Sequence, residues 1–70
     1  MTLSIPEQRA RALEADALLH DRMEARLREE LAACDGDPIA CRYYQEAICR
    51  EHASASIARR QARAERGLLA

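Results

Sequence analysis

The 70-residue sequence contains no Val, Phe, Trp or Lys, and it has only two Gly, two Pro and two Tyr. So short a chain forms one small domain, residues 1–70, which excludes a multidomain enzyme. No apolar run approaches the roughly 20 residues of a membrane span, and the N-terminus lacks the basic and apolar segments of a secretory signal. We therefore expect a cytoplasmic protein without a membrane segment, whose cysteines stay reduced.

Large apolar side chains are few, although 49% of the residues are hydrophobic. Fifteen of the hydrophobic residues are Ala and three are Cys, and each of these buries little area. A chain of this size with so small a core gains stability from a disulfide, a metal, oligomerisation or a partner surface. The choice among these four is the main functional question that the composition raises.

A first helix is predicted over about residues 5–34. Ser4 and Glu7 have the spacing of a capping box, and Pro6 lies in the first turn, where its missing N–H costs nothing. No Gly, Pro or β-branched residue occurs between Glu7 and Cys34. Apolar and small residues at spacings of three and four indicate one buried face: Leu13, Ala17, Leu19, His20, Met23, Leu27, Leu31 and Cys34.

A second helix is predicted over about residues 38–66, after a turn at 35–37. Gly36 suits the left-handed conformation that ends a helix, and Asp37 and Pro38 suit the N-cap and first position of the next. Two long helices joined by so short a turn must lie antiparallel, so the fold class is all-α, a two-helix hairpin. We expect a partner, or dimerisation into a four-helix bundle, to cover its remaining apolar face.

The second helix begins with large apolar residues and continues with small ones. Because Ala and Ser bury little area, residues 53–56 either pack tightly on another helix or are covered by a partner. Tyr44 follows the apolar stripe, which makes its neighbour Tyr43 the candidate exposed anchor. The predicted seam and interface residues are Leu27, Leu31, Tyr43, Tyr44, Ile48 and Ile57.

Three residues are weak candidates for a metal site. A turn centred near Gly36 places His20 opposite His52, with Cys49 one turn away. His and Cys are zinc ligands, but no second compact ligand pair exists, so the simpler interpretation is two half-buried histidines. No metal or other cofactor is therefore expected. No cysteine has a base and an orienting group at a recognisable spacing, so we predict that the protein is not an enzyme.

Cys34 and Cys41 flank the predicted turn, and both face inward. A disulfide between them needs Cα atoms within about 7 Å, which is feasible at the end of a hairpin. The alternative is a pair of buried free thiols that act as small hydrophobic groups. The sequence favours free thiols in a reducing compartment and leaves the disulfide open.

The C-terminal half of the second helix is basic. A nucleic-acid partner would be bound through phosphate contacts from such a face. The net charge of the chain is −1, however, and basic residues near a helix C-terminus are favoured by the helix dipole alone. A solvated face or a protein contact is therefore the preferred interpretation of Arg50, Arg59, Arg60, Arg63 and Arg66.

The Asp35-Gly36-Asp37 turn and two elements of the second helix, Arg42-Tyr43-Tyr44-Gln45 and Ser54-Ala55-Ser56-Ile57, carry a family resemblance. Over about residues 20–60 the chain resembles the small co-chaperones of type III secretion needle subunits. The resemblance implies a bacterial helical hairpin that accompanies a tetratricopeptide-repeat chaperone and helps to keep the needle subunit soluble in the cytoplasm. It also implies that Tyr43, Tyr44 and Ile57 are interface or seam positions.

The expected function is therefore non-catalytic protein interaction, with a helical chaperone or a second copy of the chain as partner. The alternative is a homodimeric four-helix bundle that binds RNA or DNA, similar to small plasmid copy-control RNA-binding proteins. The two functions share one cause, because a hairpin with an uncovered apolar face needs something to cover it.

Overall fold

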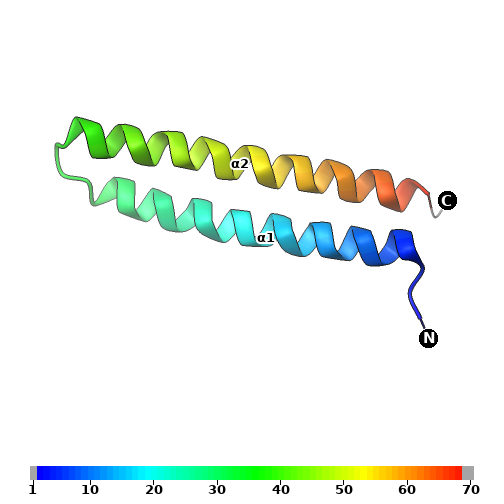
Figure 1. Cartoon of the computed structure of the whole chain (residues 1–70). Coiled ribbons are helices and arrows are strands. Elements are labelled where there is room, and N and C mark those ends of the chain that lie inside the picture. The colour runs from blue at the N-terminus through cyan, green and yellow to red at the C-terminus, as the bar shows by residue number, and fades with distance from the viewer. Residues whose placement is uncertain (1, 69–70) are drawn as a thin grey trace.

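The computed structural model describes residues 2–68 and contains two long helices, α1 (Ile5–Ala32) and α2 (Pro38–Gly67). The helices run antiparallel and side by side, with the start of α1 and the end of α2 at the same end of the molecule (Figure 1). The molecule is a thin rod of 53 × 19 × 11 Å. The predicted all-α hairpin is confirmed.

The helix ends form where capping residues occur. The Ser4 hydroxyl accepts a hydrogen bond from the Glu7 amide at 3.3 Å, and Asp37 Oδ1 accepts bonds from the Ile39 and Ala40 amides at 3.0 and 3.3 Å. These bonds satisfy amides that have no partner within the helix. Gly36 adopts a positive φ of 76°, as its predicted role in the turn requires.

The first helix ends at Ala32, two residues earlier than predicted, and α2 continues through Gly67. The amide of Cys34 bonds to the Leu31 carbonyl at 3.0 Å, which is a three-residue closure tighter than that of an α-helix. Cys34 therefore lies in the connection rather than in α1. The connection is longer than the predicted three residues.

The two helices meet along one seam with the spacing of an antiparallel coiled coil. Every residue of the seam is buried or half-buried, and consecutive members alternate between three and four residues apart, which is the heptad pattern. From α1 and the residues just after it, the seam contains Ala10, Leu13, Ala17, His20, Glu24, Leu27, Leu31 and Cys34. From α2 it contains Cys41, Tyr44, Ile48, Glu51, Ala55, Ala58, Ala62 and Glu65.

The seam has three segments of different chemistry. Near the turn, the large residues Leu27, Leu31, Tyr44 and Ile48 form what we call the turn segment. The middle is a polar layer of His20, Glu24 and Glu51, with His52 at its edge. Toward the chain ends, Ala10, Ala17, Ala55, Ala58 and Ala62 form the alanine segment, and each of these is almost fully buried.

Leu19 and Met23 were predicted to lie on the buried face, and this prediction is wrong. Leu19 is 57% exposed and Met23 is 49% exposed. The regular alternation of three and four leads from His20 to Glu24 rather than to Met23, so a charged residue occupies the seam and the apolar one lies beside it. Hydrophobicity alone selects the wrong residue at this turn of the helix.

Candidate interaction surface

Two long sides of the hairpin flank the seam, and they differ in charge. In an antiparallel coiled coil, heptad positions e of both helices lie on one side and positions g on the other. We call the e side the charged side, because acidic residues of α1 there face basic residues of α2. The e positions are Glu7, Glu14, Asp21 and Arg28 in α1 and Gln45, His52, Arg59 and Arg66 in α2.

The charged side is closed by ion pairs between the helices. Arg59 Nη1 donates to Asp21 Oδ1 at 3.2 Å, and a second contact makes the pair bidentate. Arg66 donates to Glu7 Oε2 at 3.0 Å and also contacts Glu14. Arg59 lowers the pKa of the Asp21 carboxyl, while Arg11 and then Arg66 lower that of Glu7. Two arginines of the predicted basic face are thus engaged within the chain.

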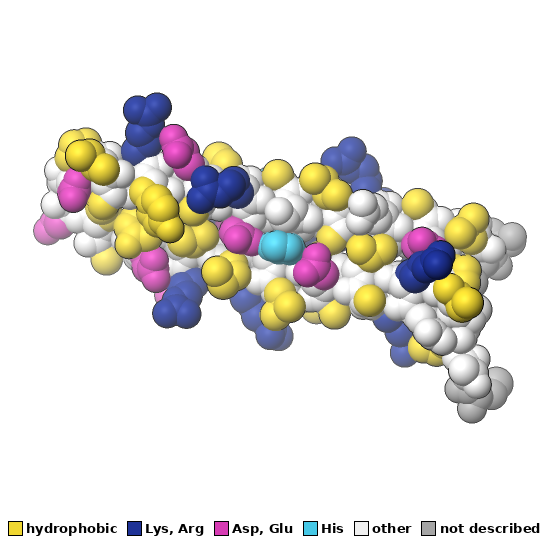
Figure 2. Space-filling model, viewed as in Figure 1, with side chains coloured by type: hydrophobic (Ala, Val, Ile, Leu, Met, Phe, Trp, Pro, Cys, Tyr) yellow, Lys and Arg dark blue, Asp and Glu magenta, His cyan; other side chains and the backbone are white. Residues whose placement is uncertain are grey.

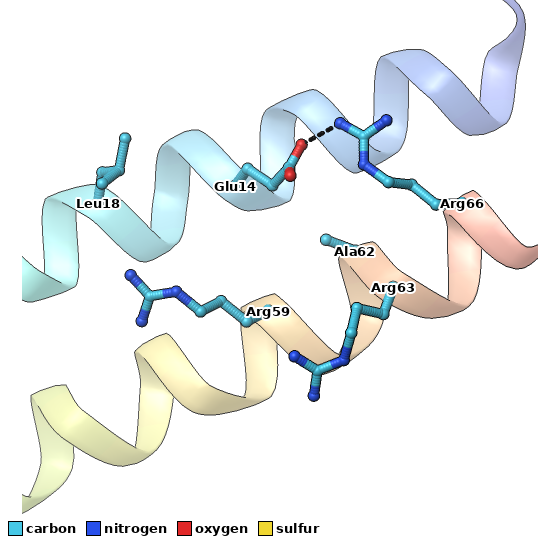
Figure 3. A pocket seen from close by; sticks show the side chains of 6 residues that line it. All are labelled: Glu14, Leu18, Arg59, Ala62, Arg63 and Arg66. Atoms are coloured by element: carbon cyan, nitrogen blue, oxygen red, sulfur yellow. Dashed lines mark hydrogen bonds and ion pairs between the residues drawn. The ribbon is translucent and has the colours of Figure 1, made fainter.

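A shallow cavity of about 320 Å³ lies along this side (Figure 3). It is lined by Glu14, Leu18, Arg59, Ala62, Arg63 and Arg66. Arg66 reaches across to Glu14 on α1, whereas Arg63 points away from α1. Because acidic groups of α1 already neutralise Arg59 and Arg66, the cavity offers an anion little uncompensated positive charge.

In the polar layer, each histidine contacts a carboxylate of the other helix. Nδ1 of His20 bonds to Glu51, and its Nε2 lies 3.5 Å from Asp16. Nδ1 of His52 lies 3.0 Å from Glu24. The bond to Glu51 raises the pKa of His20, and Arg28 followed by His52 lowers the pKa of Glu24. The layer therefore replaces apolar packing with two histidine–carboxylate contacts between the helices.

The contacts of His20 and His52 are with carboxylates of the opposite helix rather than with each other. The innermost pair of the seam is Cys34 with Cys41, so the hairpin is centred near Asp37 and Pro38 rather than on Gly36. Cys49 is exposed. Within residues 2–68, no cluster of three His, Cys, Asp or Glu side chains is placed to hold a metal ion.

The opposite side is rich in exposed apolar residues, and we call it the apolar side. Ile5, Leu19, Met23, Tyr43 and Ile57 all occupy heptad positions c or g there, and all are roughly half exposed or more. On the face that Figure 2 shows, hydrophobic side chains from both helices are exposed along the rod and gather near the turn. Charged residues are interspersed on the apolar side: Arg9, Asp16, Arg26, Glu30 and Arg50.

Small residues lie between the apolar ones on α2. Ala47 is buried and Ser54 is half-buried at the edge of the seam, and the exposed Arg50 lies between them along the helix. The Tyr43 ring packs edge-to-face on Tyr44 with centroids 5.4 Å apart, which fixes the orientation of an exposed aromatic group.

The six predicted interface residues divide between two places. Tyr43 and Ile57 lie on the apolar side, exposed at 60% and 48%. The others lie in the turn segment, where Ile48 is buried and the rest are half-buried: Leu27, Leu31, Tyr44 and Ile48. Sequence reasoning missed Leu19 and Met23 as surface residues, although a strict heptad that admits Glu24 would have found them.

Comparison with known proteins finds no matching family model, no similar curated protein and no similar solved structure. Neither helix, within the part of the chain that the structure describes, combines the length and the apolar character needed to cross a membrane.

Proposed function

We propose that the protein is a non-catalytic interaction module that packs its apolar side against helices of a partner protein. The observation that carries the proposal is the unequal distribution of exposed apolar residues. Of the seven large apolar residues exposed on the two helices, Ile5, Leu19, Met23, Tyr43 and Ile57 lie on the apolar side, whereas Leu18 and Ile39 lie elsewhere. Apolar residues gathered on one side of a small protein are typical of a protein interface.

Helix packing explains why the partner would be helical. The apolar side presents two helices lying side by side, with small residues between the large ones on α2. Side chains of a partner helix can therefore fit into the groove between the two helices. Two added helices would complete a four-helix bundle. They would also cover the half-buried large residues of the turn segment, which one hairpin alone leaves partly in water.

The specific form of this proposal is the co-chaperone role that the resemblance implies. The supporting features are Tyr43 and Ile57, which belong to the elements that carry the resemblance and are exposed on the apolar side. In that role the hairpin would bind a helical-repeat chaperone and stabilise its complex with a secreted subunit.

Nucleic-acid binding is less well supported. Arg59 and Arg66 are paired with acidic residues of α1, so binding a phosphate would require breaking these pairs. Among the described residues, Arg50, Arg60 and Arg63 of α2 have no acidic group within 4.0 Å. Arg50 lies on the apolar side, away from Arg63, so these three do not form one basic stripe.

Photo-crosslinking in cells tests the proposal. A photoreactive phenylalanine analogue at Tyr43, on the apolar side, should capture a partner protein. The same analogue at Leu18, which is 55% exposed on the charged side, should capture none. Mass spectrometry of the product distinguishes a second copy of the chain from a different protein. Equal capture at both positions would overturn the proposal. So would capture that is lost when nuclease is added before irradiation.

A further inference from the structure

We propose that Cys34 and Cys41 are a redox pair, which a small-molecule disulfide oxidant converts into an intrachain disulfide across the mouth of the turn. The inference does not depend on the proposed function. It assigns a covalent modification to two residues that the hairpin brings together at the end of its seam.

The geometry brings the two cysteines together at the turn, where each thiol contacts a backbone carbonyl. The Cys41 thiol donates to the Cys34 carbonyl at 3.4 Å, and the Cys34 thiol donates to the Asp37 carbonyl at 3.7 Å. Both side chains are half-buried, and they occupy the last facing positions of the seam. The contact of the Cys41 thiol with the Cys34 backbone shows that the two residues are neighbours across the turn, as a disulfide requires.

The surroundings distinguish this pair from the third cysteine. Cys49 is exposed on α2, away from the other two thiols, and has no neighbour with which to form an intrachain bond. Contact with Cys41, together with burial, raises the pKa of the Cys34 thiol, which keeps Cys34 protonated at neutral pH. The pair is therefore stable as two thiols until an oxidant is supplied.

The reaction with glutathione disulfide proceeds by two exchanges. The thiolate of one cysteine attacks a sulfur of the oxidant and releases one glutathione thiol, and the chain is left with a mixed disulfide. The thiolate of the second cysteine then attacks the protein sulfur and releases the second glutathione. The chain loses two protons and two electrons in total, and the oxidant is reduced to two thiols.

The expected consequence is a more stable turn. A disulfide restricts the unfolded chain, and even a short closed loop stabilises the folded state. For a protein of this size the melting temperature should rise by about 10 °C. The bond would hold the ends of both helices together beside Tyr43 and the turn segment.

Oxidation of the Cys49→Ser protein tests the proposal. After incubation with a glutathione disulfide buffer, the intact mass should fall by two hydrogens, no free thiol should remain, and Tm should rise and return on reduction. Trypsin cleaves after Arg28 and Arg42, so one peptide, residues 29–42, contains both cysteines. The loss of two hydrogens should map to this peptide in the wild-type chain as well, which keeps the test valid if the variant folds poorly.

The matched control is the Cys41→Ser/Cys49→Ser protein. It should retain one glutathione on Cys34 and gain no stability. The proposal is overturned if the Cys49→Ser protein keeps glutathione adducts, forms disulfides between chains, or remains unmodified while free glutathione disulfide is present.

Discussion

The turn segment and the alanine segment hold the same two helices together by different means. In the turn segment the side chains are large, and Leu27, Leu31 and Tyr44 remain half-buried because one neighbouring helix cannot surround them. In the alanine segment the side chains are small, and Ala17, Ala55 and Ala58 pack into one cluster exposed by 4% or less. The two helix backbones themselves cover a methyl group, but not a leucine or tyrosine ring.

This difference shows which surface of the hairpin is uncovered. The small residues of α2 left two interpretations open, close packing or a missing partner, and the structure supports close packing for Ala55, Ala58 and Ala62. The alanine segment is complete within the hairpin, and ion pairs of the charged side cover one of its edges. The uncovered apolar area lies instead on the apolar side and around the turn segment.

The largest expected effect comes from emptying the turn segment. Ile48→Ala removes the one large side chain that is nearly buried, exposed by 7%, and should reduce the free energy of unfolding by about 3 kcal/mol. Urea denaturation followed by circular dichroism measures the change. Ile57→Ala is the matched control, because the same residue type there is 48% exposed and should change stability far less. Equal losses would show that Ile57 is also part of the core.

The next effect comes from overfilling the alanine segment. Ala58→Leu should destabilise the hairpin by about 2 kcal/mol, because a larger side chain forces the backbones apart. Ala53→Leu, at an exposed position on the same helix, should leave stability nearly unchanged or raise it slightly. If Ala58→Leu stabilises the protein, the helices do not pack closely there and the comparison between the segments fails.

A smaller effect is expected at the turn that joins the helices. Gly36 has a φ of 76°, and a Cβ added there meets no atom within 4 Å. Gly36→Ala therefore lowers the free energy of unfolding only because an L-residue disfavours this left-handed backbone conformation. We expect a loss of about 1 kcal/mol. Gly67→Ala, at the helical end of α2, is the control and should stabilise by a few tenths of a kcal/mol. Thermal melting of both variants measures the difference, and the same sign for both would contradict the left-handed turn.

The polar layer and the charged side together predict a pH dependence of stability. Because the pKa of His20 is raised above 6.5, its contribution to stability is fully present below that pH and is lost as pH rises through the raised value. The pKa values of Glu7, Asp21 and Glu24 are lowered, so their contributions are present above about pH 4.5 and are lost as pH falls. Tm should therefore be highest between about pH 5 and 6.5.

His20→Gln tests the alkaline part of this profile. The variant keeps a polar side chain near Glu51 and cannot become charged, so its Tm should no longer fall between pH 6.5 and 8 beyond the change shown by the rest of the chain. An unchanged profile would show that another group titrates in this range.

The hairpin could be predicted because its signals are local. Ser4, Asp37 and Pro38 begin the helices, and Gly36 takes the left-handed conformation, as their chemistry requires. The long interval without helix-breaking residues left no other element to consider. Fold class therefore followed from residues that act within one turn of their own position.

The contacts between the helices could not be predicted equally well. The placement of His20 opposite His52 assumed a turn centred on Gly36, and a small change in that centre gives each histidine a different partner. Leu19 and Met23 were assigned to the seam because they are apolar, whereas Glu24 and Glu51 occupy seam positions. A carboxylate is acceptable there only because a histidine of the opposite helix contacts it, and no local pattern reveals such a pair.

The neighbouring residues Leu18 and Leu19 provide the most direct test of the central claim that the apolar side binds a partner. They have the same side chain and nearly the same exposure, 55% and 57%, but lie on opposite sides of the hairpin. The partner that crosslinking identifies is bound, without crosslinking, to tagged Leu19→Glu and Leu18→Glu proteins. The fraction retained after a wash at high salt is then measured. The account predicts that Leu19→Glu weakens retention by at least about 10-fold and that Leu18→Glu retains the partner as the wild type does. Equal retention by both variants, or a loss confined to Leu18→Glu, would contradict it.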